Sequence, residues 1–144
     1  MNYTAQASAS DGSIFPSDVT DTQFTVSENW AVNQSGVNYI AYLFASIDGV
    51  SKCGTFTLSG TSYVDVDCGF SSGARFVLVK CYSTISNWDV FDTARGITSG
   101  NDPALALNDT AAESSGPNIN PLSSGFSINA ANFNAGDYIF YAIA

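Results

Sequence analysis

The residues of this chain whose types and spacing could support chemistry are pairs of carboxylates. Asp65 and Asp67 stand two apart in an alternating segment, so both point to the side of a strand opposite Val64 and Val66. Two carboxylates on one face are candidate ligands for calcium or a sugar, although a solvated sheet face has the same pattern. We expect the solvated face, with no metal and no cofactor.

A second pair, Asp89 and Asp92, stands three apart and points to opposite faces of a continuing strand, unlike the facing carboxylates of a glycosidase. The chain has no histidine, so a nucleophile activated by histidine cannot be assembled. Cys53, Cys68 and Cys81 form no CxxC pair, which makes them poor zinc ligands. We therefore expect a protein that is not an enzyme.

Cys53 and Cys68 flank a predicted hairpin, which makes a disulfide between them a candidate. The alternation of that hairpin instead places Gly54 opposite Cys68. We expect three reduced thiols, as in a reducing cytosol.

Four basic residues stand out in so acidic a chain, and three of them have predicted structural roles. Arg95 lies on a predicted turn beside Asp92, where a fixed ion pair is expected and a ligand contact is the alternative. Arg75 begins a predicted strand and Lys80 nearly ends it, so we expect both to be solvated.

Aromatic side chains are the other candidate contacts. Trp88 alternates with Val90 and is expected in the core. Trp30 lies in a predicted loop, where it could stack on a sugar ring, fill an intersubunit pocket or fold over a sheet edge. Tyr63 and Tyr82 are further candidates for receptor or subunit contact.

These residues would be positioned by β-strands throughout. Short runs rich in Val, Ile, Phe, Tyr and Thr, separated by Gly, Ser, Asn or Asp, predict strands at Gln23–Val26, Asn38–Ile47, Gly54–Leu58, Ser62–Asp67, Arg75–Tyr82, Trp88–Phe91, Gly125–Ile128 and Asp137–Ile143. Only Asp102–Asn108 and Asp109–Glu113 could hold a helical turn. We expect an all-β, antiparallel β-sandwich or jelly-roll-like domain of about eight strands over residues 1–144, after an irregular entry at residues 1–22.

One strand-turn-strand pattern occurs twice, at residues 24–45 and 126–144. Each copy has a short apolar start, a polar loop with Asn and Gly, and then Tyr-Ile followed by an apolar run. Asn38–Ile47 and Tyr138–Ile143 are apolar on both faces, so they should be central strands or strands covered by a partner. The two copies could be neighbours in one sheet.

Composition limits the partners. The net charge of −9, from 13 acidic and 4 basic residues, argues against nucleic acid and against anionic lipid. Only 12% of the residues are charged, which suits a surface partly covered by copies of the same chain or by other proteins. No apolar run reaches the ~18 residues of a membrane span, and the first residues lack the pattern of a secretory signal.

The middle of the chain carries a resemblance to a known group of proteins. The residues that carry it are 37–52, 67–80, 88–97, 100–103, 107–108 and 110–113. Over roughly Gly36 to Ala144, the chain resembles a C-terminal domain of uncharacterised function in tail-fibre and receptor-binding-type structural proteins of tailed bacteriophages.

The resemblance implies a non-enzymatic virion protein, assembled in the host cytoplasm, that forms the distal tip of a tail fibre. It implies a homotrimer that contacts other virion proteins and attaches to a bacterial surface receptor, such as a glycan. A capsid-decoration or head-fibre protein and a carbohydrate-binding module or receptor-degrading domain are the alternatives.

Overall fold

The computed structural model describes Thr20, residues 22–116 and residues 118–144. The expected irregular entry, residues 1–22, lies outside these ranges except for Thr20 and Thr22. By their contacts the described residues divide into two compact units, those within Ser8–Leu43 and those within Phe44–Ala144. Every strand among the described residues belongs to the second unit.

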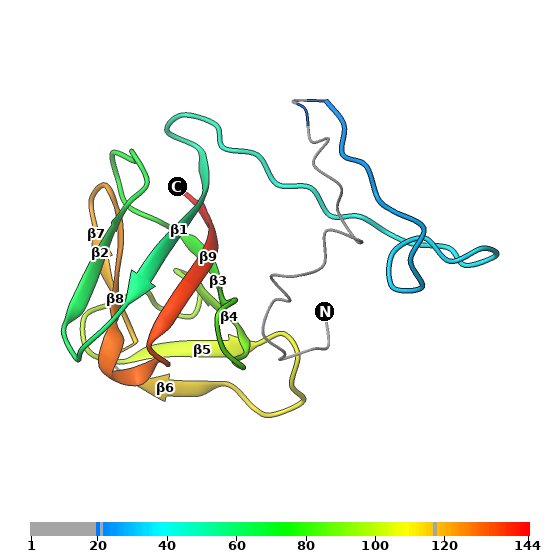
Figure 1. Ribbon diagram of the computed structural model, residues 1–144. Helices are drawn as coiled ribbons and strands as arrows, with labels where there is room; N and C mark the ends of the chain where they lie inside the picture. The colour runs from blue at the N-terminus through cyan, green and yellow to red at the C-terminus, as the bar shows by residue number, and fades with distance from the viewer. Residues whose placement is uncertain (1–19, 21, 117) are drawn as a thin grey trace. The chain divides into compact units, whose positions relative to one another are not determined.

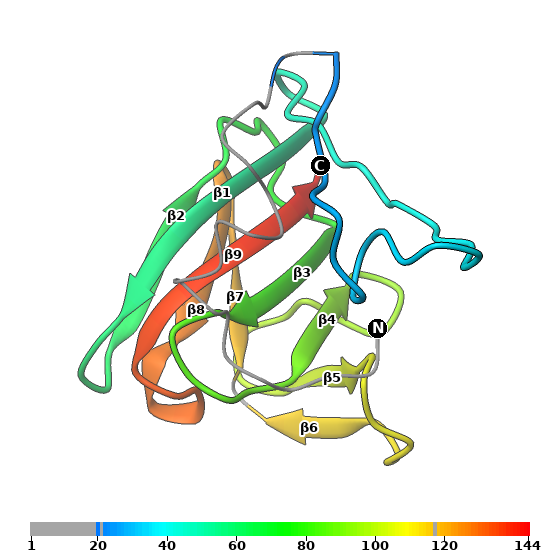
Figure 2. The same cartoon turned by 45° about the vertical axis from the view of Figure 1, so that its right-hand side comes forward.

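The second unit consists of two antiparallel sheets (Figure 1). Its nine strands are β1 (Ser51–Leu58), β2 (Tyr63–Asp67), β3 (Phe76–Cys81), β4 (Trp88–Asp92), β5 (Asp102–Ala106), β6 (Ser114–Gly116), β7 (Ile119–Leu122), β8 (Gly125–Asn129) and β9 (Gly136–Ile143). One sheet has six strands in the order β1-β9-β3-β4-β5-β6, and the other has three in the order β2-β8-β7. Figure 2 shows β1, β9, β3 and β4 side by side, with β7 and β8 in the layer behind. The predicted antiparallel β-sandwich is therefore confirmed.

Six of the eight expected strands form, because their alternation matches the faces that the two sheets bury. In β2, Val64 and Val66 turn inward while Asp65 and Asp67 are exposed. The C-terminal strand β9 is central, with β1 on one side and β3 on the other. Its Tyr138, Phe140 and Ala142 side chains are buried in the core, whereas Ile139 on the opposite face is 39% exposed.

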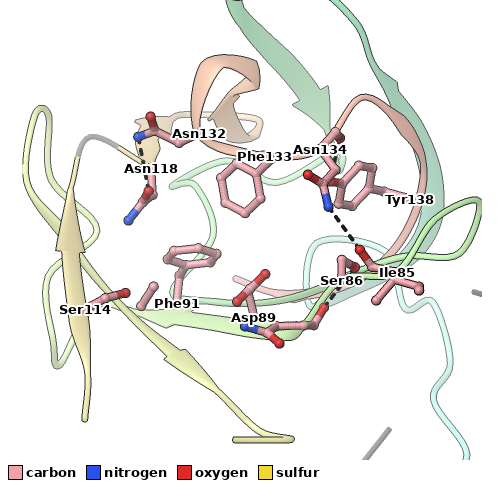
Figure 3. A pocket seen from close by; sticks show the side chains of 12 residues that line it. Ile85, Ser86, Asp89, Phe91, Ser114, Asn118, Asn132, Phe133, Asn134 and Tyr138 are labelled. Carbon is pink, nitrogen blue, oxygen red and sulfur yellow. Dashed lines mark hydrogen bonds between the residues drawn. The ribbon is translucent and has the colours of Figure 1, made fainter. Parts of the chain in front are cut away.

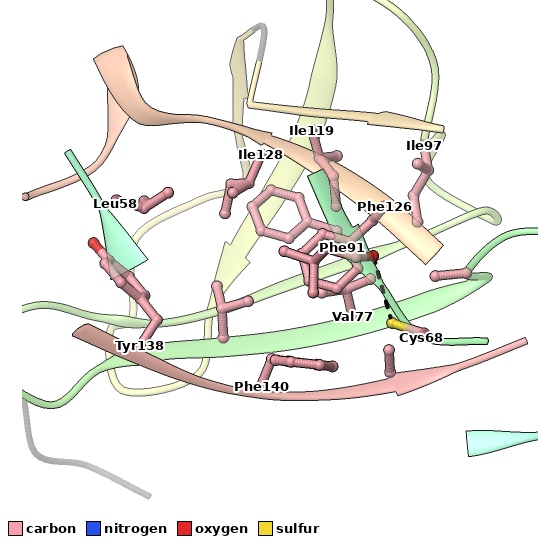
Figure 4. Close-up of a cluster of buried hydrophobic side chains, with 14 of the residues drawn as sticks. Leu58, Cys68, Val77, Phe91, Ile97, Ile119, Phe126, Ile128, Tyr138 and Phe140 are labelled. Carbon is pink, nitrogen blue, oxygen red and sulfur yellow. Dashed lines mark hydrogen bonds between the residues drawn. The ribbon is translucent and has the colours of Figure 1, made fainter. Parts of the chain in front are cut away.

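The core lies between the two sheets (Figure 4). Phe126 of β8 has no exposed surface and meets the rings of Phe56 and Phe140 edge-on, at centroid distances of 6.1 and 5.5 Å. Phe56 also stacks on Tyr138 at 5.2 Å. Aromatic contacts therefore join β8 of the small sheet to β1 and β9 of the large one.

Gly125 fixes how closely the small sheet packs on the turn that follows β2. A Cβ at Gly125 would collide with the carbonyl oxygen of Val66 and lie 3.0 Å from the amide nitrogen of Cys68. Only glycine allows this backbone approach, which leads β8 directly beside β2.

The first copy of the repeated pattern, residues 24–45, does not form the expected hairpin. Gln23–Val26 and Asn38–Ile47 contain no strand, although Phe24 and Ile47 each make an isolated bridge, that of Ile47 being with Ser51. Strand propensity needs a neighbouring backbone to bond, and residues 38–46 have none in the described part of the chain. Within its own unit, Trp30 lies in a turn, and its backbone carbonyl oxygen accepts a hydrogen bond of 2.8 Å from the Tyr39 hydroxyl.

The second copy forms its two strands, but they are not a hairpin. β8 and β9 belong to different sheets, and the 3-10 helix η1 (Ala130–Asn132) begins the connection between them. Because the first copy forms no strand, the suggestion that the two copies are neighbours in one sheet is wrong. A strand-turn-strand pattern can therefore connect strands of two different sheets as well as form a hairpin within one sheet.

β1 and β2 are also split between the two sheets, so the predicted hairpin between Cys53 and Cys68 does not exist. All three cysteines are free. Burial raises the pKa of the Cys68 thiol to about 11. This thiol is therefore protonated at neutral pH.

Asp102–Asn108, one of the two segments that could have held a helical turn, instead contributes residues 102–106 to β5, between β4 and β6. β6 and β7 were not expected either. Asp102 is fully buried and its two carboxyl oxygens accept hydrogen bonds from the amides of Thr98 (2.7 Å) and Ile119 (3.1 Å). This clamp joins the loop before β5 to the strand β7 of the other sheet.

Two residues on the outer face of the large sheet differ from expectation. Phe91 takes the core face of β4, so the alternation turns Trp88 outward, where it is half-buried outside the core cluster. Lys80 is only 5% exposed, and its ammonium group donates to the carbonyl oxygen of Ser86 at 2.7 Å. Its position in the middle of the sheet, between β9 and β4, explains why it is not solvated.

Candidate functional site

A cleft of about 420 Å³ opens at one end of the sandwich (Figure 3). Its walls come from the loop between β3 and β4, from β4, β5, β6 and β9, from the turn between β6 and β7, and from the connection between β8 and β9. The residues that line it are Ile85, Ser86, Asn87, Asp89, Phe91, Ala104, Ser114, Asn118, Asn132, Phe133, Asn134 and Tyr138. A volume of this size is typical of small-molecule sites.

The local sequence explains how each wall is placed. Asp89 and Phe91 stand two apart on β4 and share its inner face, so Phe91 fills the core while Asp89 reaches the open end. The 3-10 helix η1 is capped by the Asn129 side chain, which accepts from the Ala131 amide at 3.1 Å. This cap fixes the start of the segment that carries Asn132, Phe133 and Asn134 into the cleft.

Amide side chains hold the rim in place. Asn118 donates to the carbonyl oxygen of Asp102 (3.1 Å) and accepts from Asn132 (3.3 Å). Across the opening, Asn134 donates to the carbonyl oxygen of Ile85 (3.0 Å). These bonds tie loops that are distant in sequence, so the rim is organised before any ligand arrives.

The floor is aromatic. Phe133 meets Phe91 at 6.2 Å and Tyr138 at 6.4 Å between ring centroids, in both cases edge-to-face. Phe91 and Tyr138 are fully buried, while Phe133 remains partly exposed to the cleft. The Tyr138 hydroxyl donates to the carbonyl oxygen of Asn134 at 2.8 Å, and burial raises the pKa of that hydroxyl.

Asp89 is the one carboxyl group among the lining residues. Burial raises its pKa from 3.8 to about 6, and the nearby positive charge of Lys80 opposes this rise. Burial likewise lowers the pKa of Lys80. The cleft therefore holds a partly desolvated carboxylate at neutral pH, which costs stability.

This cost predicts that replacing Asp89 with Asn stabilises the fold at neutral pH. The folded state binds the Asp89 proton more tightly than the unfolded state, so wild-type stability falls as pH rises from about 4 to about 6. An Asp89→Asn variant has no such loss. We expect it to be more stable by roughly 1–2 kcal/mol at pH 7.5, with partial solvation of the side chain reducing the full effect, and equal to wild type at pH 4.

Urea unfolding at the two pH values measures this difference. Asp65→Asn, which changes an exposed carboxyl on β2, serves as the control and should stay within about 0.5 kcal/mol of wild type at both. A less stable Asp89→Asn protein at pH 7.5 would contradict the prediction.

The residues singled out from the sequence lie elsewhere. Trp30 is 79% exposed, Tyr63 is exposed at the start of β2, and Tyr82 is half-buried just after β3. None of the three lines the cleft. Asp65 and Asp67 point to solvent, and Asp67 accepts from the Gly69 amide at 2.8 Å.

The expected pairing of Arg95 with Asp92 is present. The Arg95 guanidinium contacts the Asp92 carboxylate and also lies 2.8 Å from an oxygen of Glu113. Asp92 additionally accepts from the Arg95 backbone amide at 2.8 Å. The cluster fixes the turn after β4 and does not reach the cleft.

Sequence reasoning considered Asp89 only as a partner of Asp92 and missed the Asn-Phe-Asn segment at residues 132–134. The one available signal was a tripeptide of two amides and an aromatic residue in a predicted loop, a composition that also suits an ordinary turn. The neighbours of this segment in space come from four other parts of the chain, so no local pattern identifies them.

The lining offers amide, hydroxyl and carboxyl groups for hydrogen bonding. It has one carboxyl group, no basic side chain and no thiol. Among the described residues, no group of three His, Cys, Asp or Glu side chains could hold a metal ion. In the same part of the chain, no helix has the length and apolar character needed to cross a membrane.

Comparisons with known proteins identify one family. Searches of curated proteins and of solved structures find no match. A family described as "Domain of unknown function (DUF7483)" matches residues 1–144. Because the match spans the whole sequence, this chain belongs to the DUF7483 family.

Proposed function

We propose that this chain is a non-enzymatic structural protein of a bacteriophage virion, a distal tail-fibre domain that attaches the particle to its host. The observation that carries the proposal is the cleft with its pre-positioned polar rim and aromatic floor, on a fold with few charges. A binding role fits a lining that lacks a basic residue and a second carboxyl. The resemblance of residues 36–144 to tail-fibre domains supplies the biological setting.

The partner of such a domain is a receptor on the bacterial surface. Net negative charge and the absence of lysine and arginine from the cleft lining disfavour phosphate-rich receptors. Neutral surface groups remain the better match. Attachment would then depend on hydrogen bonds and packing rather than on long-range attraction.

Assembly as a homotrimer is part of the proposal. The described residues expose an unusual number of large apolar side chains in one stretch of sequence, namely Val37, Tyr39, Ile40, Tyr42, Leu43 and Phe44. A subunit contact would cover exposed apolar side chains of this kind. Three copies would also multiply a weak single-site affinity through avidity.

The experiment that tests the proposal is binding of the fluorescently labelled protein to a panel of Gram-negative and Gram-positive bacteria, measured by flow cytometry. We expect saturable binding to a subset of strains, abolished by unlabelled protein. Light scattering on a sizing column gives the chain number of the same sample, expected to be three. Absence of binding to every strain, or equal binding to all of them, would overturn the attachment function and favour the capsid-decoration alternative.

A further inference from the structure

The cleft contains hydrogen-bonding groups that the described part of the chain does not use. The Asp89 carboxyl has no hydrogen-bond partner there, and neither has the Ser114 hydroxyl. The Asn87 oxygen accepts from Asn108 at 3.0 Å, which leaves the Asn87 amide nitrogen as a spare donor. The Asn134 nitrogen is occupied by Ile85, which leaves the Asn134 oxygen as a spare acceptor.

These spare groups are oriented by the bonds that their other atoms make. The contact with Asn108 fixes the Asn87 amide plane, and the contact with the Ile85 carbonyl fixes the plane of Asn134. Figure 3 shows Asp89 rising from the strand below toward the Phe133 ring, with Asn134 to one side of that ring. Two spare acceptors, the Asp89 carboxyl and the Asn134 side-chain oxygen, therefore lie near one partly exposed aromatic ring, in a cleft that Asn87 also lines (Figure 3).

This combination matches the surface of a sugar. A pyranose ring has hydroxyl groups around its edge, each of which donates and accepts, and C–H groups on its faces that pack against aromatic rings. A carboxylate accepts hydroxyl hydrogens as strong, charge-assisted bonds. The Asn87 amide nitrogen can donate a hydrogen bond to a sugar hydroxyl, and the Asn134 amide oxygen can accept one.

The electrostatics of the lining select among sugars. Asp89 is its one acidic group and no cation lines the cleft, so uronic acids, sialic acids and phosphorylated sugars would meet repulsion without compensation. A metal-bridged sugar is also disfavoured, because Asp89 has no second acidic ligand among the lining residues.

We propose that the cleft binds one neutral saccharide unit, with the Asp89 carboxylate accepting hydrogen bonds from its hydroxyls and Phe133 packing against its ring face. Asn87 and Asn134 are the secondary contacts. This inference rests on the proposed function, because it names the chemical class of the surface receptor that the cleft recognises.

The test measures binding of defined saccharides to the whole chain by saturation-transfer NMR and calorimetry. The probes are glucose, galactose, mannose, N-acetylglucosamine and N-acetylgalactosamine with their disaccharides, and the comparison set is glucuronic acid and sialic acid. We expect at least one neutral probe to bind. Asp89→Ala should weaken it more than tenfold, whereas Asp65→Ala, at an exposed carboxyl of β2, should change it less than twofold.

Loss of binding in Asp89→Ala is attributable to the cleft only in a folded protein, which circular dichroism and the unfolding midpoint establish. Asp89→Asn provides a second variant that is expected to fold more stably than wild type and still bind more weakly. Absence of binding to every neutral probe, a preference for an acidic sugar, or unchanged affinity in both Asp89 variants would overturn the proposal.

Failure of this inference is distinguishable from failure of the attachment function. If Asp89→Ala leaves binding to bacteria intact, the saccharide proposal is contradicted and the attachment function is retained. If saccharide binding depends on Asp89 but the protein adsorbs to no strain, the saccharide proposal is retained and the attachment function is contradicted.

Discussion

An Asp102→Ala variant is expected to lose about 3–5 kcal/mol of the free energy of unfolding. The Asp102 side chain has no exposed surface, and its two oxygens accept from the backbone amides of Thr98 and Ile119. Alanine removes both acceptors and leaves the buried Ile119 amide and the part-buried Thr98 amide without these partners, at a cost of roughly 1–3 kcal/mol each. Chemical denaturation followed by tryptophan fluorescence measures the change.

A matched control separates this clamp from the general effect of removing an aspartate. Asp109 also accepts from a backbone amide, that of Ala111 at 3.1 Å, but in an exposed turn where water replaces the lost oxygen. Asp109→Ala should therefore cost less than about 1 kcal/mol. Asp102→Asn keeps the shape and one acceptor, so an intermediate loss is expected. If Asp102→Ala costs no more than Asp109→Ala, the clamp does not hold the sheets as described.

The clamp also matters for the cleft. The carbonyl oxygen of Asp102 accepts from Asn118, which in turn accepts from Asn132 on the rim. One buried residue thus connects the packing of the two sheets to the orientation of the rim amides. A change in saccharide affinity on Asp102→Asn, at a site with no ligand contact, would report this connection.

The segment that begins at Asp102 shows a limit of local sequence patterns, because it could have held a helical turn and forms a strand instead. Asp-Pro followed by Ala and Leu is a typical helix start, with a capping aspartate and a proline in the first turn. Here the Asp102 oxygens bond amides of the preceding loop and of β7 instead of the next turn of its own segment. These tertiary partners thus override the local preference for a helix start. No pattern in residues 98–119 predicts that Thr98 and Ile119 are the partners of Asp102.

The strands that were predicted had a signal of their own. Residues 63–67 alternate so clearly that their inner and outer faces could be assigned, and residues 138–143 are apolar enough to require a central place. Residues 38–46 carry a similar apolar run without becoming a strand, because propensity does not supply a neighbouring backbone. The sequence therefore indicated which segments could be strands better than it indicated which would pair.

The cleft could not have been predicted in this way. Its polar groups come from three loops and from the strands β4, β6 and β9, and Asp89 is distinctive only through its burial. That burial makes the residue costly for folding, and functional residues are often destabilising in this sense. The single variant Asp89→Asn is therefore predicted to gain stability and to lose saccharide affinity.

The second large effect is expected at the centre of the core. Phe126→Ala should lower the free energy of unfolding by about 3–5 kcal/mol, because the ring is fully buried and the cavity cannot collapse between two hydrogen-bonded sheets. Its contacts with Phe56 and Phe140 join the three-stranded sheet to the six-stranded one. Phe126→Leu retains most of the volume and should cost less than about 1.5 kcal/mol, which keeps a measurable transition if the alanine variant fails to fold.

Ile85 provides the control, since its side chain is 65% exposed and Ile85→Ala should change stability by no more than about 0.5 kcal/mol. The walls of the cleft come from β4, β5 and β6 on one side and from the connection after β8 on the other, so weaker packing at Phe126 should also loosen the site. We therefore expect Phe126→Leu to weaken saccharide binding while it leaves the protein folded. Equal stability of Phe126→Ala and Ile85→Ala would mean that this ring does not join the two sheets.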